Sequence, residues 1–85
     1  MNIRFTPTGW DDYLDWKTED KKTLSRINRL ILSICREGPL KGIGKPEPLR
    51  FIQAYSRRID EKNRLVYQIT PTDLLILSCK GHYED

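Results

Sequence analysis

The feature that most constrains the fold is a segment rich in glycine and proline, residues 38 to 48, near the middle of the 85-residue chain. It contains three glycines and three prolines, so neither a helix nor the interior of a strand fits it. Before this segment apolar residues recur mainly at three- and four-residue spacing, and after it mainly at two-residue spacing. The chain therefore divides into a mainly helical half and a strand half.

The start of the chain predicts a strand and then a helix. Ile3 and Phe5 alternate with polar residues, which favours a short strand over residues 2 to 6. Thr8 followed by Asp11 resembles a capping box, which predicts that a helix begins there. One face of this helix carries Trp10, Tyr13, Leu14 and Lys17.

A second helix is marked more clearly. Its apolar positions recur every three or four residues, and the basic residues between them fall elsewhere. Gly38-Pro39 predicts its end, because proline cannot continue a helix and glycine commonly follows one. The apolar positions are Leu24, Ile27, Leu30, Ile31, Ile34 and Cys35.

The second half predicts a meander of three antiparallel strands. Residues 55 to 60 alternate, and after a turn Leu65, Tyr67 and Ile69 share one face of the next strand. Residues 74 to 79 are apolar on both faces, which indicates a central strand. We therefore expect an α+β fold, with an N-terminal strand and two helices packed on one face of a mainly antiparallel sheet.

Length and composition narrow the class of protein. Eighty-five residues predict a single domain, residues 1–85, with a modest core. No apolar run approaches the roughly 20 residues that span a bilayer, and the N-terminus lacks the apolar region of a signal peptide. We expect a cytoplasmic protein with no membrane partner. Cys35 and Cys79 lie in apolar contexts and are expected to be buried free thiols.

Positive charge is concentrated in residues 41 to 64, with seven Lys or Arg against three acids, a net of +4 in a chain whose formal charge is +3. Such a stretch is the expected footprint of phosphate binding. A solvated charged face is the alternative. Lys45 is a candidate for phosphate or RNA binding in this stretch.

Three residues are candidates for chemistry. Glu47 lies between Pro46 and Pro48, which restrict its backbone, although an exposed loop acid would look the same. Arg64 opens a predicted strand, where arginine is usually solvated. His82 is the only histidine, and its ordinary pKa suits proton transfer at neutral pH.

Together these residues match the needs of RNA cleavage without a metal ion. The 2′-hydroxyl of RNA is an internal nucleophile, so cleavage needs a base, a cation for the phosphate and an acid for the leaving 5′-oxygen. Glu47, Arg64 and His82 supply that set, and Tyr83 can stack on a base. Neither a cofactor nor a metal site is expected, because one histidine and two cysteines offer no zinc-like spacing.

Adjacent arginines in the first strand of the meander cannot both serve this site. Arg57 and Arg58 are consecutive, so they point to opposite faces of a strand. At most one of them can therefore share a concave site with Arg64.

Five segments, in order, resemble the YoeB/Txe family of toxins in the RelE superfamily. The resemblance covers nearly the whole chain and implies a microbial-ribonuclease-like fold. It also implies cleavage of mRNA in the ribosomal A site, inhibition by a cognate antitoxin and, frequently, a toxin homodimer. The segments are Trp10-Asp-Asp-Tyr-Leu14, Gly44-Lys-Pro-Glu-Pro-Leu49, Ser56-Arg-Arg-Ile59, Arg64-Leu-Val-Tyr67 and His82-Tyr83.

The resemblance also implies roles for single residues. Glu47 matches the family's general base and His82 its general acid. Arg64 matches the arginine that stabilises the transition state, and Tyr83 matches the aromatic residue that positions substrate. Arg50 and Arg58 match basic positions that contact phosphate.

The sequence departs from the family pattern in three places. The connection from Arg50 to Tyr55 is about two residues short, with Ala54 where a glycine is expected, and Tyr55 replaces a tryptophan. The acidic pair Glu84-Asp85 extends beyond Tyr83. The shorter connection is expected to alter how Arg50 faces Glu47, and the acidic tail is expected to weaken the attraction of RNA.

Two other function classes use the same features. A catalytically silent RNA- or ribosome-binding module would use the basic stretch but would not need Glu47 or His82. A protein-interaction domain would depend on the helix faces, and its binding would be insensitive to salt, whereas phosphate contacts weaken steeply as salt rises.

Overall fold

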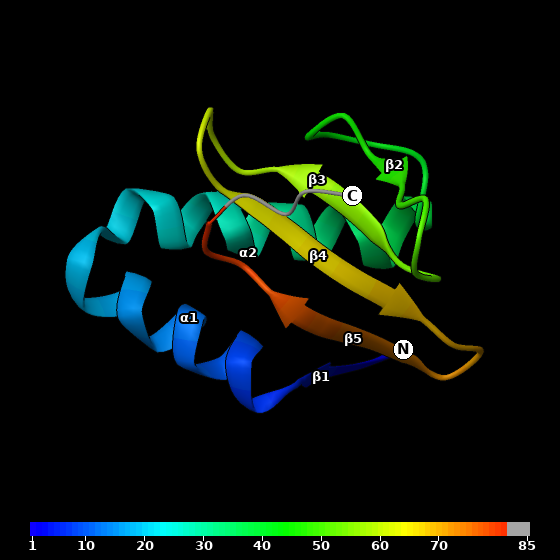
Figure 1. The fold of residues 1–85 in the computed structure, drawn as a ribbon, viewed down its shortest axis with the longest axis horizontal. Coiled ribbons are helices and arrows are strands. Elements are labelled where there is room, and N and C mark those ends of the chain that lie inside the picture. The colour runs from blue at the N-terminus through cyan, green and yellow to red at the C-terminus, as the bar shows by residue number, and fades with distance from the viewer. Residues whose placement is uncertain (82–85) are drawn as a thin grey trace.

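Two helices cover one face of a five-stranded sheet in the described part of the protein, residues 1–81 of a computed structural model (Figure 1). This is the α+β architecture predicted from the sequence. Neither helix is long and apolar enough to cross a membrane. The elements are β1 (Asn2–Phe5), α1 (Pro7–Glu19), α2 (Lys21–Glu37), β2 (Glu47–Pro48), β3 (Tyr55–Arg58), β4 (Arg64–Ile69) and β5 (Asp73–Ser78).

The strand order in the sheet is β1-β5-β4-β3-β2. The predicted meander of β3, β4 and β5 is confirmed, and β1 adds to β5 as a parallel neighbour. β5 lies between β1 and β4, as its apolar character on both faces predicted. Its Leu74 and Ile76 are fully buried.

The glycine- and proline-rich segment contains one pairing that the sequence did not indicate. Glu47 and Pro48 form a two-residue strand at the edge of the sheet and pair with Ser56 and Tyr55 of β3. An edge position accommodates Pro48, because proline has no N–H to donate to a further strand. The segment thus returns to the sheet at the candidate base Glu47.

The predicted start of the first helix is wrong by two residues. Thr6, not Thr8, is the N-cap, and its hydroxyl accepts a hydrogen bond of 3.0 Å from the backbone N–H of Gly9. Pro7 occupies the first turn, where its missing N–H costs nothing. The Thr6 hydroxyl also lies 2.9 Å from the carbonyl of Leu77, so the cap ties the start of α1 to β5.

Of the residues on the face of α1 that carries Trp10, Tyr13, Leu14 and Lys17, only Tyr13 packs against the core, and it is partly buried. Gly9 and Trp16 are buried, whereas Trp10 is 47% exposed and Leu14 is 39% exposed. α1 approaches β5 so closely that a Cβ on Gly9 would lie 2.5 Å from the carbonyl oxygen of Ile76. This approach sets the rotation of the helix, because only glycine fits at the contact.

α2 follows its apolar pattern closely. Ile27, Leu30 and Ile34 are at most 1% exposed, and the helix ends at Gly38 with φ 95°, as predicted. These side chains pack on β4 and β5 to form the main core. Its buried members are Trp16, Ile27, Leu30, Ile31, Ile34, Ile59, Leu65, Tyr67, Leu74, Ile76 and Cys79.

The two cysteines differ in environment. Both are free thiols, but only Cys79 is buried, so the expectation of burial is wrong for Cys35. Ile31 and Ile34 take the buried positions on α2, and Cys35 lies at the edge of that face. Burial raises the pKa of the Cys79 thiol to about 12, whereas Cys35 is open to solvent.

Thr6→Ala is expected to destabilise the protein by about 1–2 kcal/mol, because it removes the N-cap of α1 and the link to β5. Thr8→Ala is the matched control, and its free energy of unfolding should stay within about 0.5 kcal/mol of the wild type. Urea unfolding at equilibrium measures both. Equal losses in the two variants would contradict the assignment of the cap.

In the folded protein at pH 8, a thiol reagent is expected to label Cys35 and to spare Cys79, because the thiolate is the reactive form. Denaturation should make the second thiol reactive. Labelling is measured by mass spectrometry, with Cys35→Ser as the control that loses the fast reaction. Fast labelling of that variant without denaturant would show that Cys79 is accessible.

Candidate functional site

The side chains on the helix-free face of the sheet include three candidates from the sequence. Glu47 pairs with Ser56, and Arg58 pairs with Arg64, so these four side chains share one face. The alternate residues of β3 and β4 point to the face that α2 covers, and Figure 1 shows α2 passing behind these strands. The sheet therefore brings Glu47, Arg58 and Arg64 together on its helix-free face.

Glu47 and Arg64 are in direct contact. The Arg64 Nη1 atom lies 3.0 Å from Glu47 Oε1 and 3.4 Å from the hydroxyl of Ser56. The Arg64 side chain is only 19% exposed, whereas that of Glu47 is 56% exposed. A partly buried guanidinium thus holds a carboxylate that remains open to solvent. Such a pair can bind a phosphate and accept a proton next to it.

The backbone around Arg64 is fixed by a tight turn. Asp60 Oδ1 accepts hydrogen bonds from the N–H groups of Lys62 and Asn63, at 2.8 and 2.7 Å. The Asn63 side chain then accepts from the N–H of Gly81, and the N–H of Arg64 donates to the Gly81 carbonyl at 3.0 Å. Gly81, the last described residue, therefore lies against Arg64.

Two further basic candidates lie on β3 and just before β2. Arg58 is exposed on the same face, and its N–H donates to the carbonyl of Gly44. Lys45 is exposed two residues before Glu47 and has φ 50°, a left-handed conformation that is uncommon outside glycine. The predicted residues His82 and Tyr83 lie outside the described residues.

The connection between β2 and β3 is short and closed. The N–H of Leu49 donates to the carbonyl of Ala54 at 2.9 Å, and the N–H of Ala54 donates to Ile52. Ala54 is buried and does not have positive φ, so it does not need to be glycine here. Arg50 is exposed in this connection, with its guanidinium 5.5 Å from the centre of the Phe51 ring.

Sequence reasoning missed Ser56 and left the place of Arg57 open. Ser56 is fully buried and contacts Arg64. Its alternation with Arg58 on the same face of the predicted strand was the available signal. Arg57 is also fully buried, on the opposite face, so Arg58 is the arginine of the pair that shares a face with Arg64.

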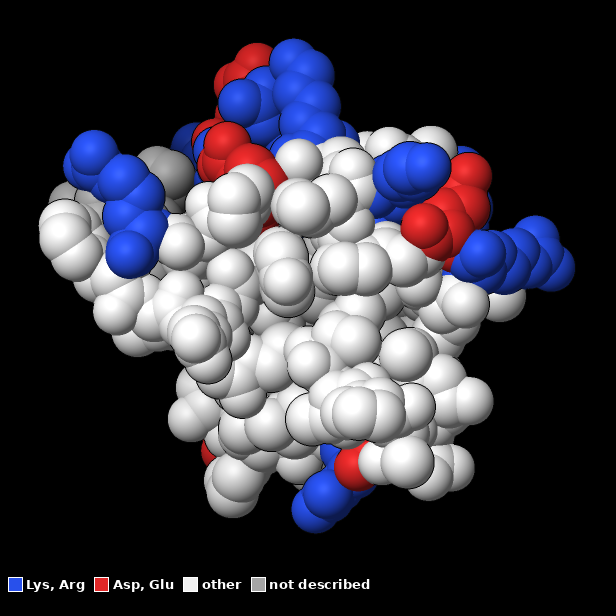
Figure 2. Space-filling view, turned by 90° about the vertical axis from the view of Figure 1, so that its right-hand side faces the viewer, with Lys and Arg blue, Asp and Glu red and all other residues white. Residues whose placement is uncertain are grey.

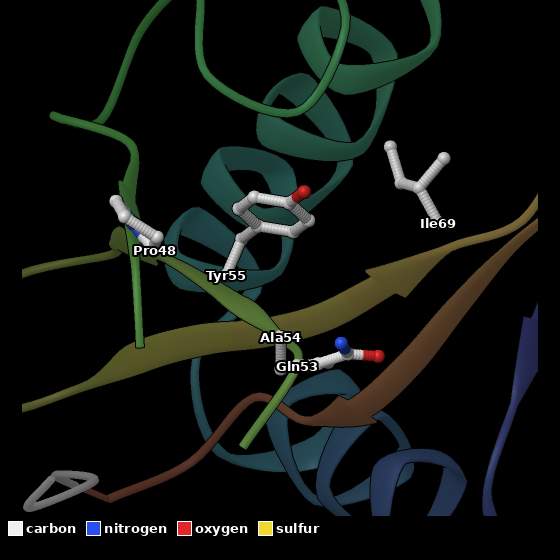
Figure 3. A pocket seen from close by; sticks show the side chains of 5 residues that line it. All are labelled: Pro48, Gln53, Ala54, Tyr55 and Ile69. Atoms are coloured by element: carbon white, nitrogen blue, oxygen red, sulfur yellow. The ribbon is translucent and has the colours of Figure 1, made fainter. Parts of the chain in front are cut away.

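A pocket of about 440 Å³ lies near Glu47 but on the other side of the sheet. Figure 3 shows Tyr55 and Ile69 extending to the same side of β3 and β4, with Pro48 beside Tyr55. Pro48 follows Glu47 in the strand, so the two side chains point to opposite faces. The pocket is therefore separate from the pair of Glu47 and Arg64. Its lining residues are Pro48, Gln53, Ala54, Tyr55 and Ile69.

A second concave surface, of about 510 Å³, is mainly apolar. It contains an aromatic cluster in which the rings of Trp10 and Tyr13 stack at 5.7 Å and Phe5 packs edge-on against both. The other lining residues are Ile3, Asn28, Ile31, Leu32 and Cys35. Within the described residues, no group of three or more His, Cys, Asp or Glu side chains could hold a metal ion.

Charge is unevenly distributed over the surface. Figure 2 shows the side of the molecule that lies at the right of Figure 1, and Lys, Arg, Asp and Glu side chains gather at its rim. The centre of that side carries none of them. The surface therefore offers both a charged region and a broad uncharged one.

Comparison with known proteins gives a consistent result. Residues 5–83 match the family described as a YoeB-like toxin of a bacterial type II toxin–antitoxin system. The chain is 54% identical to Toxin YoeB of Synechocystis over 86 aligned residues, which cover 99% of both chains. It is 49% identical to Toxin YoeB of Streptomyces coelicolor over 85 residues, which cover 98% of this chain and 100% of the relative.

Solved structures agree in fold. The YoeB dimer from Staphylococcus aureus superposes with a TM-score of 0.93 at 46% identity and covers 98% of both chains. A heterotetrameric YoeB–YefM toxin–antitoxin complex from the same organism superposes with a TM-score of 0.91, also at 46% identity and with 98% of both chains covered.

Glu47→Gln is expected to change the free energy of unfolding by less than about 1 kcal/mol, because the Glu47 carboxylate is exposed to solvent, which screens its attraction to Arg64. Urea unfolding at pH 7 measures the change, and the exposed Glu61→Gln in the 60–63 turn is the matched control. A loss of more than about 2 kcal/mol, specific to Glu47→Gln, would mean that the pair holds the fold together.

Proposed function

Because the chain belongs to the YoeB-like toxin family of bacterial type II toxin–antitoxin systems, we propose that it is an endoribonuclease that needs no metal ion. It cleaves mRNA in the ribosomal A site and so inhibits translation. The observation that carries this proposal is the 3.0 Å contact between Glu47 and Arg64 on the helix-free face of the sheet. An exposed carboxylate held by a partly buried guanidinium matches the base and the cation that the reaction requires.

The chemistry uses the RNA's own 2′-hydroxyl. Glu47 removes the proton of this hydroxyl while the 2′-oxygen attacks the adjacent phosphorus, and the bond from phosphorus to the 5′-oxygen breaks. Arg64 stabilises the charge that grows on the phosphate oxygens. His82 donates a proton to the departing 5′-oxygen, and Tyr83 positions the substrate. Both residues follow Gly81, whose carbonyl accepts a hydrogen bond from the N–H of Arg64.

The basic side chains around the pair attract and orient the nucleic acid. Arg58 shares the face of Glu47 and Arg64, and Lys45 and Arg50 are exposed on either side of β2. Each contact to a phosphate releases counterions, so binding weakens steeply as salt rises. In this proposal the nucleic-acid partners are the ribosome and its mRNA, and the protein acts in the cytoplasm.

We infer two protein partners, a cognate antitoxin and a second copy of the chain. The solved YoeB–YefM complex and YoeB dimer of Staphylococcus aureus support this inference. Large exposed apolar side chains support it as well, since contiguous apolar surface commonly marks a protein interface. These side chains include Trp10, Leu14 and Leu32.

The proposal is tested by inducing the protein in bacterial cells and mapping mRNA 5′ ends. We expect new ends at a fixed position within translated codons. Glu47→Gln and Arg64→Met should each lower cleavage by roughly a hundredfold or more, whereas Glu61→Gln should cleave like the wild type. Cuts that ignore the reading frame would refute the ribosomal part of the proposal.

A silent ribosome-binding module is the alternative, favoured by the exposed basic side chains alone. It predicts that growth inhibition persists without new 5′ ends and that Glu47→Gln and His82→Ala leave it unchanged. Loss of inhibition in both variants, together with loss of the cuts, excludes this alternative.

A further inference from the structure

Arg57 brings a guanidinium into the interior of the protein and uses all of its hydrogen-bond donors there. The residue is fully buried, and each of its five N–H groups has an acceptor between 2.6 and 2.9 Å away. Three acceptors are backbone carbonyls of one segment. The acceptors are Tyr67 Oη, Ser33 Oγ and the carbonyl oxygens of Gly38, Lys41 and Ile43.

Within the described residues Arg57 forms no ion pair. The Glu37 carboxylate lies close by and accepts a hydrogen bond from the Ser33 hydroxyl, which itself accepts from Arg57. Gly38 is the C-cap of α2, so its carbonyl lies at the negative end of the helix dipole. The C-terminal end of α2 therefore stabilises the positive charge of the Arg57 guanidinium.

Tyr67 completes the arrangement from the neighbouring strand. Its hydroxyl accepts from Arg57 Nε at 2.9 Å and donates to the carbonyl of Pro39 at 2.6 Å. Burial raises the pKa of Tyr67, although Arg57 opposes the rise. The hydroxyl therefore stays protonated and can donate to the Pro39 carbonyl. Residues 38–44, called the anchored loop below, are thus bound to the core through four of their carbonyls.

The anchored loop lies directly on these side chains. Gly42 has φ 108°, and a Cβ there would collide with Ser33 Oγ and lie 3.0 Å from Arg57 Nη1. A Cβ on Gly44 would lie 2.6 Å from Leu30 Cδ2 and 3.2 Å from the Arg57 Cβ. Two glycines are therefore required for the backbone to close over the guanidinium.

The anchored loop leads straight into β2. The Gly44 carbonyl accepts from the N–H of Arg58, which fixes the loop against β3 one residue after Arg57. Lys45 and Pro46 follow, and Glu47 then pairs with Ser56. The backbone from Gly38 to Glu47 is thus held at several points, and the Arg57 guanidinium provides three of them.

We propose that Arg57 is a positioning residue that sets Glu47 against Arg64 by holding the anchored loop, although it contacts neither of them. This role rests on the proposed ribonuclease function. Arg57 is buried, so it does not touch the RNA. Lysine cannot replace it, because an ammonium group has three donors and lacks the planar fork.

The test measures single-turnover cleavage by the purified protein on ribosomes carrying a defined mRNA. Arg57→Lys should lower the maximal rate on the order of a hundredfold, since small displacements of a catalytic group are that costly. The ribosome concentration for half-maximal rate should stay within about twofold, because the basic surface is unchanged. Arg29→Lys, on the exposed surface of α2, is the matched control and should cleave like the wild type.

A double variant separates positioning from general structural damage. In the Glu47→Gln background, Arg57→Lys should cause no further loss, because Arg57 acts through Glu47. The proposal would be overturned if the losses of rate in the two single variants multiplied in the double variant. It would also be overturned if Arg57→Lys cleaved like the wild type, or if it changed only the ribosome concentration for half-maximal rate. Should Arg57→Lys fail to fold, Ser33→Ala removes one acceptor of the guanidinium and should lower the maximal rate about tenfold.

Hydrogen exchange gives a readout that does not depend on cleavage. In Arg57→Lys the amide of Arg58, which donates to Gly44, should exchange faster than in the wild type, while the amides of α2 keep their protection. Unchanged protection of Arg58 would overturn the positioning role. Absence of cleavage by the wild type, with faster exchange in the variant, would instead refute the proposed function and leave Arg57 as the anchor of the loop alone.

Discussion

A buried guanidinium is costly unless every donor is satisfied, and that requirement shapes this small domain. Removing an ion from water costs several kcal/mol even in real proteins. Arg57 meets the requirement with five acceptors, drawn from α2, β4 and the segment that joins α2 to the sheet. A segment rich in glycine and proline would otherwise have few reasons to adopt one path. The carbonyls of this segment provide three of the five acceptors that the guanidinium needs, and these hydrogen bonds fix the path of the segment.

Successive side chains of β3 alternate between the core and the proposed active site. Tyr55 and Arg57 face the helices, where the rings of Tyr55 and Tyr67 stack at 5.7 Å and the guanidinium is enclosed. Ser56 and Arg58 point to the helix-free face, where Ser56 is buried and Arg64 holds Glu47. One short strand thus carries both the anchor of the loop and part of the surface proposed to bind RNA, and alternation keeps the two sets apart.

Much of the fold was predictable, because its signals are local. The period of α2, its end at Gly38 and the meander were read correctly, since each depends on spacing within a few residues. The errors arose where two elements meet. Thr6, and not Thr8, caps α1, and its hydroxyl also reaches β5. Cys35 is exposed because its neighbours on α2 occupy the core.

By itself the sequence determined which residue types could do chemistry and that Arg57 and Arg58 must point in opposite directions. It also carried the motifs that place the chain in its family, from Trp10 to Tyr83. Only the tertiary structure decided which arginine is buried and that Glu47 meets Arg64 across the sheet. The physical reason is that periodicity defines two faces of an element but not their surroundings. Those depend on what packs against each face, and here the packing partners come from distant parts of the chain.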